Sequence, residues 1–190
     1  MPEPSQLSSQ RLLLRQWQAA DRDAFASLNA DPEVMAHFPA ILSRAESDAL
    51  AARCQAGLEE RGWGVWVLEQ RDSGQFLGIT GLNPVHDMPF GDGVEVLWRL
   101  AQPAWGQGFA TEAAHTALDY AFTVLELDEI VAFTTVANRR SIAVMERLGM
   151  ADCRCRFRHP ELPASSKLSQ HRLYRIDRDA FLHQQHQNSG

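Results

Sequence analysis

The segment with the clearest chemical potential runs from Val94 to Ala113, VEVLWRLAQPAWGQGFATEA. Its pattern predicts a strand, then a loop with glycine at positions 106 and 108, then the start of a helix. The first turn of a helix presents unpaired N–H groups and a partial positive charge, which together bind phosphate oxygens. Glycine lets the loop backbone approach a ligand closely and adopt positive φ. The pattern fits a phosphate-binding loop, and equally a tight turn between strand and helix.

A dinucleotide-binding turn would need a third glycine three positions after Gly108 and an acidic residue about 20 positions further on. Thr111 stands at that third position, and the loop follows several predicted strands instead of the first. The sequence therefore disfavours a Rossmann fold.

A second segment of chemical interest, NRRSIAVMERLGM, covers residues 138–150 and predicts a helix that ends at Gly149. Asn138, Ser141 and Met145 are spaced i, i+3 and i+7, so they share one face of this helix. If Asn138 faces a ligand, Ser141 can face it as well. The alternative is that Ser141 only satisfies backbone groups in the first helical turn.

The elements that must hold these two segments alternate between strand and helix patterns. Ser43 and Glu46 form a capping box, and Gly62 follows as a helix stop. The long helix after Gly108 is apolar around most of its circumference, which predicts burial against a sheet. Residues up to 9 and from 188 onward are expected to be loose, and 83–93 to be a loop. We predict a mixed α/β (α+β) domain with strands at 11–17, 64–69, 76–82, 94–100, 130–136, 153–157 and 168–176, and helices at 19–30, 43–60, 109–125 and 138–148.

Length and composition narrow the class of protein. The 190 residues predict a single domain spanning 1–190, with a core at about 11–178. The formal net charge of −6 argues against a nucleic-acid partner, since nucleic-acid binders usually carry a basic surplus. No stretch approaches 18 apolar residues, and the first residues lack the basic and apolar regions of a signal peptide. We therefore expect no membrane span and a cytoplasmic location.

Cysteine and histidine give no sign of a disulfide or metal framework. The chain has three cysteines, Cys54, Cys153 and Cys155, and an odd number with C-x-C spacing does not predict paired bridges. His183 and His186 are spaced i, i+3, but no other ligand cluster accompanies them. No metal site is predicted.

Taken together, the two segments resemble the GNAT family of N-acetyltransferases, and more narrowly its branch of ribosomal-protein N-terminal acetyltransferases. Residues 103–113, PAWGQGFATEA, resemble the first motif of the family, and residues 138–150 resemble the second signature of that branch. The resemblance extends over about 11–175, including RLLLR at 11–15 and DPEV at 31–34. It implies a mostly antiparallel central sheet, flanked by helices, in which one parallel pair of strands splays apart.

The resemblance also implies the cofactor, acetyl-CoA as co-substrate, without a metal. Its pantetheine arm would run like an added strand along the backbone of Trp98, Arg99 and Leu100, and Asn138 would bind or position that arm. The family usually has Arg or Gln where this chain has Pro103, so phosphate binding must depend on backbone groups. The backbone N–H groups implied for the pyrophosphate belong to Trp105, Gly106, Gln107, Gly108, Phe109, Ala110 and Thr111.

The catalytic residues implied by the resemblance depart from the common family pattern at one position. Many members carry a tyrosine that protonates the departing thiolate, and Met145 stands in its place here. The ribosomal-protein branch uses a serine for this step, and Ser141 matches it. No cysteine lies in either motif, so we expect the amine to attack the thioester directly.

Glu95 is the first candidate for the base that deprotonates the amine. It lies on the strand expected beside the acetyl group, and an amine needs a base because its ammonium form dominates at pH 7. A water chain or a role in a salt bridge at the strand edge are the alternatives. His37, His86 and Asp92 fall in predicted loops that would border the amine site or simply face solvent.

We therefore expect an N-acetyltransferase that transfers an acetyl group from acetyl-CoA to a primary amine, either a protein N-terminus or a small molecule. The alternative is a CoA-binding sensor or partner module without transferase activity, which the methionine at position 145 favours. The sequence does not identify the acceptor. A homodimer is expected only because symmetric pairs are the commonest oligomers.

Overall fold

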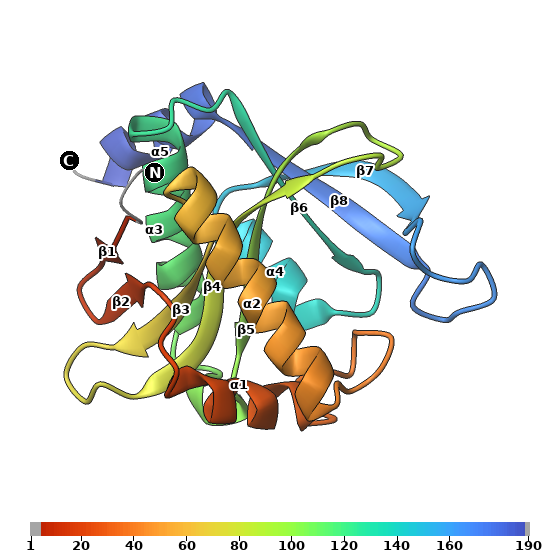
Figure 1. Ribbon diagram of the computed structural model, residues 1–190. Helices are drawn as coiled ribbons and strands as arrows, with labels where there is room; N and C mark the ends of the chain where they lie inside the picture. The colour runs from red at the N-terminus through yellow and green to blue at the C-terminus, as the bar shows by residue number, and fades with distance from the viewer. Residues whose placement is uncertain (1–4, 189–190) are drawn as a thin grey trace.

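The computed structural model describes residues 5–188, which form one sheet with helices on both faces (Figure 1). None of the helices in this part of the chain is long and apolar enough to cross a membrane. The strands are β1 (Leu7–Ser8), β2 (Leu12–Arg15), β3 (Val65–Gln70), β4 (Phe76–Val85), β5 (Gly93–Leu100), β6 (Glu129–Thr135), β7 (Ala151–Arg158) and β8 (Gln170–Asp177). The helices are α1 (Asp21–Ala30), α2 (Arg44–Arg61), α3 (Phe109–Thr123), α4 (Arg139–Arg147) and α5 (Arg178–Asn188), with a short 3-10 turn, η1, at Gln102–Ala104.

The sheet follows the order β1-β2-β3-β4-β5-β6-β8-β7 and is antiparallel except at one place. There β5 and β6 run parallel and share a single register pair, Glu95 with Val131. In contrast, β4 pairs with β5 along its whole length, from Gly93 to Leu100. The expected mixed fold, with a mostly antiparallel sheet and a splayed parallel pair, is confirmed.

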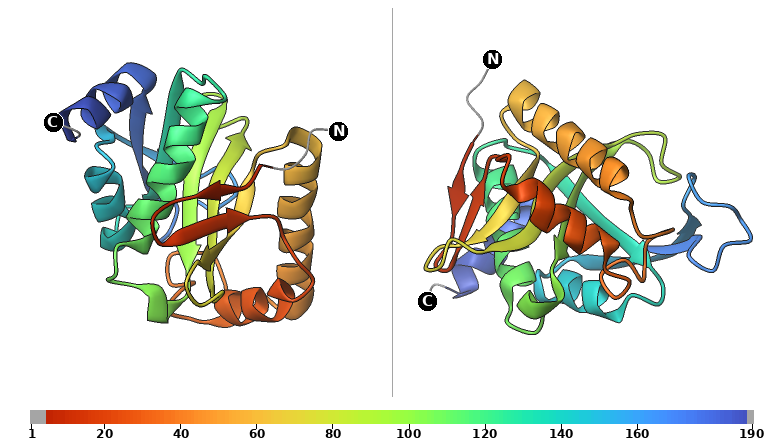
Figure 2. Two further views of the ribbon diagram at one scale, coloured as in Figure 1. Left: turned by 90° about the vertical axis from the view of Figure 1, so that its left-hand side faces the viewer. Right: turned by 60° about the horizontal axis from the view of Figure 1, so that its bottom comes forward.

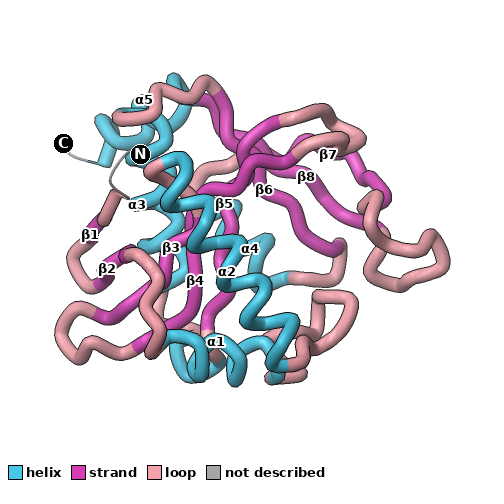
Figure 3. The backbone as a smooth tube through the Cα atoms, viewed as in Figure 1, coloured by secondary structure: helices cyan, strands magenta, loops and turns pink. Residues whose placement is uncertain are grey.

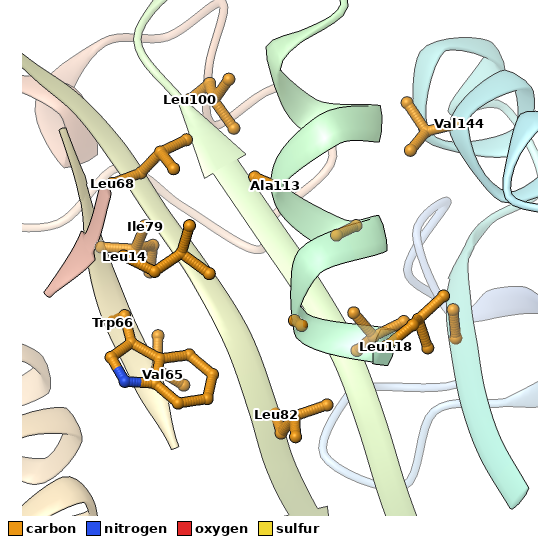
Figure 4. Close-up of a cluster of buried hydrophobic side chains, with 14 of the residues drawn as sticks. Leu14, Val65, Trp66, Leu68, Ile79, Leu82, Leu100, Ala113, Leu118 and Val144 are labelled. Carbon is orange, nitrogen blue, oxygen red and sulfur yellow. The ribbon is translucent and has the colours of Figure 1, made fainter. Parts of the chain in front are cut away.

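The two faces of the sheet are covered by different helices (Figures 2 and 3). The helices α1 and α2 pack on one face of β3 and β4, while α3 packs on the opposite face of β4 and β5, with α4 beside it. Four alanines of α3, at 113, 114, 117 and 121, are completely buried. Such small side chains let the helix axis lie close to the sheet, and Leu82, Leu100 and Leu118 belong to the same buried core (Figure 4).

The ends of the chain differ from the prediction. The segment expected to be loose up to position 9 contains β1, which pairs with β2 as an edge strand, and the terminal segment after β8 forms α5. The side chain of Asp177 accepts a hydrogen bond from the N–H of Ala180 at 2.8 Å and so caps this helix, while Phe181 is buried in the core. Asn188 ends α5, and residues 189–190 lie outside the described residues.

Several element boundaries also differ from the prediction. The strand β4 continues to Val85, so residues 83–85 belong to the sheet and not to a loop, because Asn83, Pro84 and Val85 each pair with a residue of β5. The long helix α3 ends at Thr123, two residues earlier than expected. The second face of the C-terminal strands holds a smaller apolar cluster around Val85, Val131 and Leu173.

Replacing Gly81 by alanine should destabilise the protein. Gly81 lies in the central strand β4 with φ of 152°, and an added Cβ would lie 2.1 Å from the carbonyl oxygen of Gly64. Side chains avoid this backbone region, so we expect a loss of at least about 2 kcal/mol of unfolding free energy. That loss corresponds to a Tm lower by roughly 4–8 °C in a thermal melt.

Gly93→Ala is the matched control, because an added Cβ at Gly93 meets no heavy atom within 4 Å. Its Tm should stay within about 2 °C of the wild type. An equally stable Gly81→Ala variant would contradict the close approach of β3 and β4.

Candidate active site

The parting of β5 and β6 leaves backbone groups of β5 without a neighbouring strand. The N–H of Ala101 donates to the carbonyl of Leu77 at 2.8 Å, which turns this residue toward β4. Because backbone groups alternate along a strand, those of Trp98 and Leu100 turn toward β6, while those of Arg99 turn toward β4. Beyond the Glu95–Val131 pair, no register pair joins β5 to β6 in the described chain. An extended ligand can therefore add itself to Trp98 as a strand would.

The Gly106–Gly108 loop lies at the same end of β5. Gly106 and Gly108 have φ of 74° and 80°, a backbone that favours glycine, and Gly108 is the N-cap of α3. No side chain caps this helix, so the first-turn N–H groups of Phe109, Ala110 and Thr111 keep no intrahelical acceptor. The arrangement is an anion-binding helix N-terminus beside the open edge of β5.

Arg11 and Glu112 hold this loop from the N-terminal hairpin. The guanidinium of Arg11 donates to Glu112 at 2.6 Å and to the carbonyl of Gln107 at 3.0 Å, and it lies 4.5 Å above the ring of Phe109. Burial alone would raise the pKa of Glu112, but hydrogen bonds from Ser9 and Arg11 outweigh it and leave that pKa below its ordinary value. Glu112 therefore braces the loop in ionised form.

Trp105 connects the loop to both β5 and α4. Its indole N–H donates to the carbonyl of Leu100 at 2.9 Å, and the guanidinium carbon of Arg140 lies 4.1 Å from the centre of its ring. Trp105 thus anchors the loop, and Arg140 brings a positive charge from the first turn of α4 to the same place. Anionic ligands are favoured by this charge in addition to the dipole of α3.

Asn138 and Ser141 form one hydrogen-bonded unit at the start of α4. The side-chain oxygen of Asn138 accepts from the N–H of Ser141 at 3.2 Å, and its amide nitrogen donates to the hydroxyl oxygens of Ser141 at 3.0 Å and Thr134 at 2.9 Å. Since the oxygen of Ser141 already accepts a hydrogen bond, its own O–H is left to donate elsewhere. Met145, further along this helix, is buried in the core.

Glu95 is placed where the two strands part. Its carboxylate accepts a hydrogen bond from the side chain of Asn83 at 2.9 Å. Burial raises the pKa of Glu95 to about 7, and the bond from Asn83 opposes that rise only in part. None of the ion pairs found within residues 5–188 includes Glu95, which removes the salt-bridge interpretation. A carboxyl group with this pKa can take up a proton near neutral pH.

The other candidates from the sequence, His37, His86 and Asp92, lie in two separate places. His37 reaches the C-terminal end of β6, where its Nδ1 lies 3.2 Å from the hydroxyl of Thr135. Burial, and to a lesser degree the charge of Arg140, lower the pKa of His37. His86 and Asp92 pair with each other at 3.1 Å in the exposed β4–β5 loop. Within the described ranges, no three His, Cys, Asp or Glu side chains are grouped so as to hold a metal ion.

The sequence did not identify Arg11, Asn83, Thr134 or the stacking of Arg140 on Trp105. Arg11 and Glu112 are 101 residues apart, so no local pattern indicates their contact. Asn83 lies within the register of β4 and β5 opposite Glu95, which becomes visible only when the strand boundaries are known. The repeated glycines and the Asn–Ser spacing were the signals that the sequence did carry.

Comparison with known proteins gives a family match and related sequences. Residues 11–151 match the family model described as "Acetyltransferase (GNAT) domain". The uncharacterised protein YkkB of Bacillus subtilis is 30% identical over 153 residues, covering 79% of this chain and 87% of that protein. An FsC-acetyl coenzyme A-N(2)-transacetylase of Aspergillus fumigatus is 29% identical over 172 residues, covering 86% and 72%.

Solved structures share the fold over nearly the whole chain. An acetyltransferase from Agrobacterium tumefaciens has a TM-score of 0.74 at 27% identity, covering 90% of this chain and 94% of that one. A spermidine N-acetyltransferase from Vibrio cholerae, in complex with CoA and spermine, has a TM-score of 0.71 at 21% identity, covering 92% and 99%. A ribosomal L7/L12 alpha-N-protein acetyltransferase in complex with CoA has a TM-score of 0.73 at 16% identity, covering 93% and 99%. At such identities the last two show a common fold alone.

The raised pKa of Glu95 should appear as a pH-dependent stability. The folded protein holds the Glu95 proton more tightly than the unfolded chain, so this contribution to stability is complete below about pH 4.5 and is lost as pH rises toward 7. Glu95→Gln lacks this loss. The difference in unfolding free energy between Glu95→Gln and the wild type, measured by urea titration, should shift in favour of the variant by roughly 1–3 kcal/mol as the pH rises from 4.5 to 8.

Glu33→Gln, in the exposed segment before α2, serves as the control and should track the wild type at every pH. Parallel stability curves for Glu95→Gln and the wild type would show that the Glu95 carboxyl is not desolvated.

Proposed function

Because this chain belongs to the GNAT family of acetyltransferases and is therefore an acyltransferase, we propose that it transfers an acetyl group from acetyl-CoA to a primary amine. The single observation that carries this proposal is the unpaired edge of β5 lying next to the glycine loop of α3. The edge of β5 suits an extended arm such as pantetheine, and the glycine loop suits a phosphate group. CoA contains both parts. The CoA complexes of the two acetyltransferase structures described above support this assignment.

The residues that would hold acetyl-CoA are mainly backbone donors. The pyrophosphate would rest on the N–H groups of residues 105–111, with Arg140 beside them. Arg140 would then replace the Arg or Gln side chain that the family usually has at the position of Pro103. The pantetheine arm would pair with the free backbone groups of Trp98. This path directs the thioester toward the junction of Glu95 and Val131, where the strands meet.

The reaction then needs two proton movements around one bond exchange. Glu95 accepts a proton from the acceptor ammonium, and the free amine attacks the thioester carbon to form a C–N bond. As the tetrahedral intermediate collapses, the C–S bond breaks and the CoA sulfur takes a proton from Ser141. The second proton of the amine nitrogen leaves through water and restores the Ser141 hydroxyl. Glu95 finally releases its proton to solvent, so that amide and CoA thiol are the products.

The hydrogen bonds of Ser141 support its role as the proton donor. Asn138 donates one hydrogen bond to the hydroxyl oxygen and fixes its position, so the O–H can be directed at the thiolate. Glu95 is suited to the opposite task, because a base with a pKa near the working pH is half available to accept protons. Its carboxylate also attracts the ammonium form of the acceptor.

The alternative function is a CoA-binding module without turnover. One observation favours it: Met145, at the place of the family's tyrosine donor, is buried and carries no proton to give. The membership in the ribosomal-protein branch, the cytoplasmic location and the homodimer all stay predictions. The names of the relatives indicate different acceptors, so no relative's acceptor is assigned to this chain.

Acetyl-CoA and CoA should stabilise the protein against heat, whereas NAD and ATP should not. A ligand at 100 times its Kd adds about 2.7 kcal/mol of stability, because it binds only the folded state. For a chain of this size that is a Tm rise of roughly 5–11 °C in a thermal-shift titration. A larger shift with NAD or ATP than with either CoA species would contradict the proposed cofactor.

Ser141→Ala should separate catalysis from binding. Loss of the proton donor is expected to lower kcat by about 100-fold or more, because positioned proton transfer contributes that much to such reactions. The Kd of acetyl-CoA, measured by calorimetry, should change less than threefold. Ser73→Ala, in the exposed turn between β3 and β4, is the matched control and should keep full activity. Undiminished turnover in Ser141→Ala would remove Ser141 from the mechanism.

A further inference from the structure

The face of the sheet that carries Glu95 can be traced from strand to strand by register. Side chains alternate along a strand, so Leu97 and Arg99 share the face of Glu95 on β5. Glu95 pairs with Val131, which places alternate β6 residues, Phe133 and Thr135, on the same face. Through the pairs of β6 with β8 and of β8 with β7, the face continues to Leu173, His171 and Phe157. Glu95 presents its carboxyl group on this side of the sheet.

Five aromatic rings from four segments meet on this face, and we call them the aromatic cluster. Phe133 of β6 contacts the rings of Phe157 and Phe90 at 5.8 Å each, and His171 and His159 lie 5.1 Å apart. Phe90 and Phe157 also contact each other at 5.3 Å, and contacts at 5.6–6.1 Å link the phenylalanines to the two histidines. His171 is 8% exposed, whereas the other four members of the cluster are half-buried.

Phe133 brings the aromatic cluster to the reaction centre. It lies two residues beyond Val131 on β6, in the part of the strand that has left β5. The ring therefore borders the opening between the strands on the face of Glu95. A group attached to the amine that Glu95 deprotonates would meet the exposed edge of this cluster first.

The charges on the same face disfavour a second ammonium group along β5. Glu129 shares this face, but its carboxylate is already paired with Arg175 at 2.6 Å. Arg99, four residues from Glu95 and about 13 Å away along the strand, carries a positive charge that makes no ion pair with a carboxylate among the described residues. A second ammonium placed along β5 would meet this guanidinium.

The remaining titratable groups near the face, two histidines and Asp92, provide no further site for an ammonium group. Burial lowers the pKa of His171 and of His37, so both rings are neutral at pH 7. Asp92, in the loop that carries Phe90, accepts hydrogen bonds from the N–H of Asp87 and lies 3.1 Å from the ring of His86. Its carboxylate therefore has partners of its own.

We propose that the acceptor of this enzyme is a singly charged primary amine carried on an aromatic body, which packs against the aromatic cluster while its ammonium meets Glu95. The inference rests on the proposed transferase function for the position of the acetyl group. It disfavours polyamines as the preferred substrates, because a second ammonium placed along β5 would meet the guanidinium of Arg99, which has no carboxylate partner among the described residues. The same chemistry occurs in a free arylalkylamine and in a peptide that begins with an aromatic residue.

The test compares matched amines in steady-state acetylation. For 2-phenylethylamine, kcat/KM should exceed that for spermidine at least tenfold, with n-butylamine between them. Phe133→Leu keeps an apolar side chain but removes the ring. It should lower kcat/KM for 2-phenylethylamine by about 3- to 10-fold and change the value for n-butylamine less than twofold. Phe76→Leu, at the first residue of β4 and outside the aromatic cluster, is the control. It should leave the ratio of the kcat/KM values for the two amines unchanged.

A binding measurement keeps this inference separate from the proposed function. Equilibrium dialysis of 2-phenylethylamine and spermidine against the CoA complex needs no turnover. If no amine is acetylated but 2-phenylethylamine still binds at least tenfold tighter, the transferase proposal fails, whereas the preference of this face for an aromatic amine stands. Spermidine reacting or binding as well as 2-phenylethylamine would overturn the inference. A tripeptide amide with N-terminal phenylalanine distinguishes the two sources, since the preferred one should show the higher kcat/KM.

Discussion

The shape of the active site depends on the single pairing between Glu95 and Val131. Parallel strands that paired along their whole length would consume the backbone groups of Trp98 and close the route between the two faces of the sheet. Because β4 pairs with β5 from end to end, β5 stays extended even where β6 has left it. The opening is thus supported on one side by a complete ladder, and on the other by β6, which is held by β8. A rigid sheet presents unsatisfied polar groups without losing its own stability.

Groups that favour anions and a group that favours cations lie near opposite ends of β5. At the C-terminal end of β5, the dipole of α3 and the guanidinium of Arg140 favour anions, and the Arg11–Glu112 contact holds that loop to the N-terminal hairpin. Near its N-terminal end, the desolvated carboxyl of Glu95 favours a proton or an ammonium. A molecule with phosphate at one end and a reactive acyl group at the other is therefore oriented before any substrate-specific contact is made. Under our proposal the acceptor meets a different surface, made of rings and not of ions.

Local patterns in the sequence predicted local structure well. The strand, glycine loop and helix at 94–113 follow from residue types within a few positions of one another, and so does the Asn138–Ser141 spacing. The splayed pair was expected from a family resemblance, since no periodicity indicates which strands are neighbours. The pKa of Glu95 and the aromatic cluster could not be foreseen, because burial and register join residues from distant segments such as Asn83 and Phe157. The helix α5 was missed because its amphipathic pattern is weak and only Phe181 is deeply buried.

The double use of Asn138 has a consequence for how such a site can change during evolution. The same amide that begins α4 also holds the Ser141 hydroxyl and the hydroxyl of Thr134 at the end of β6. A substitution at Asn138 would disturb a helix start, a strand end and the hydroxyl that we propose as proton donor at once, so these features are coupled. A lineage that acquires a different proton donor must first find another way to begin this helix. By contrast, the rings of the aromatic cluster come from four independent segments and can be exchanged one at a time, which leaves the acceptor free to diverge while the transfer chemistry is retained.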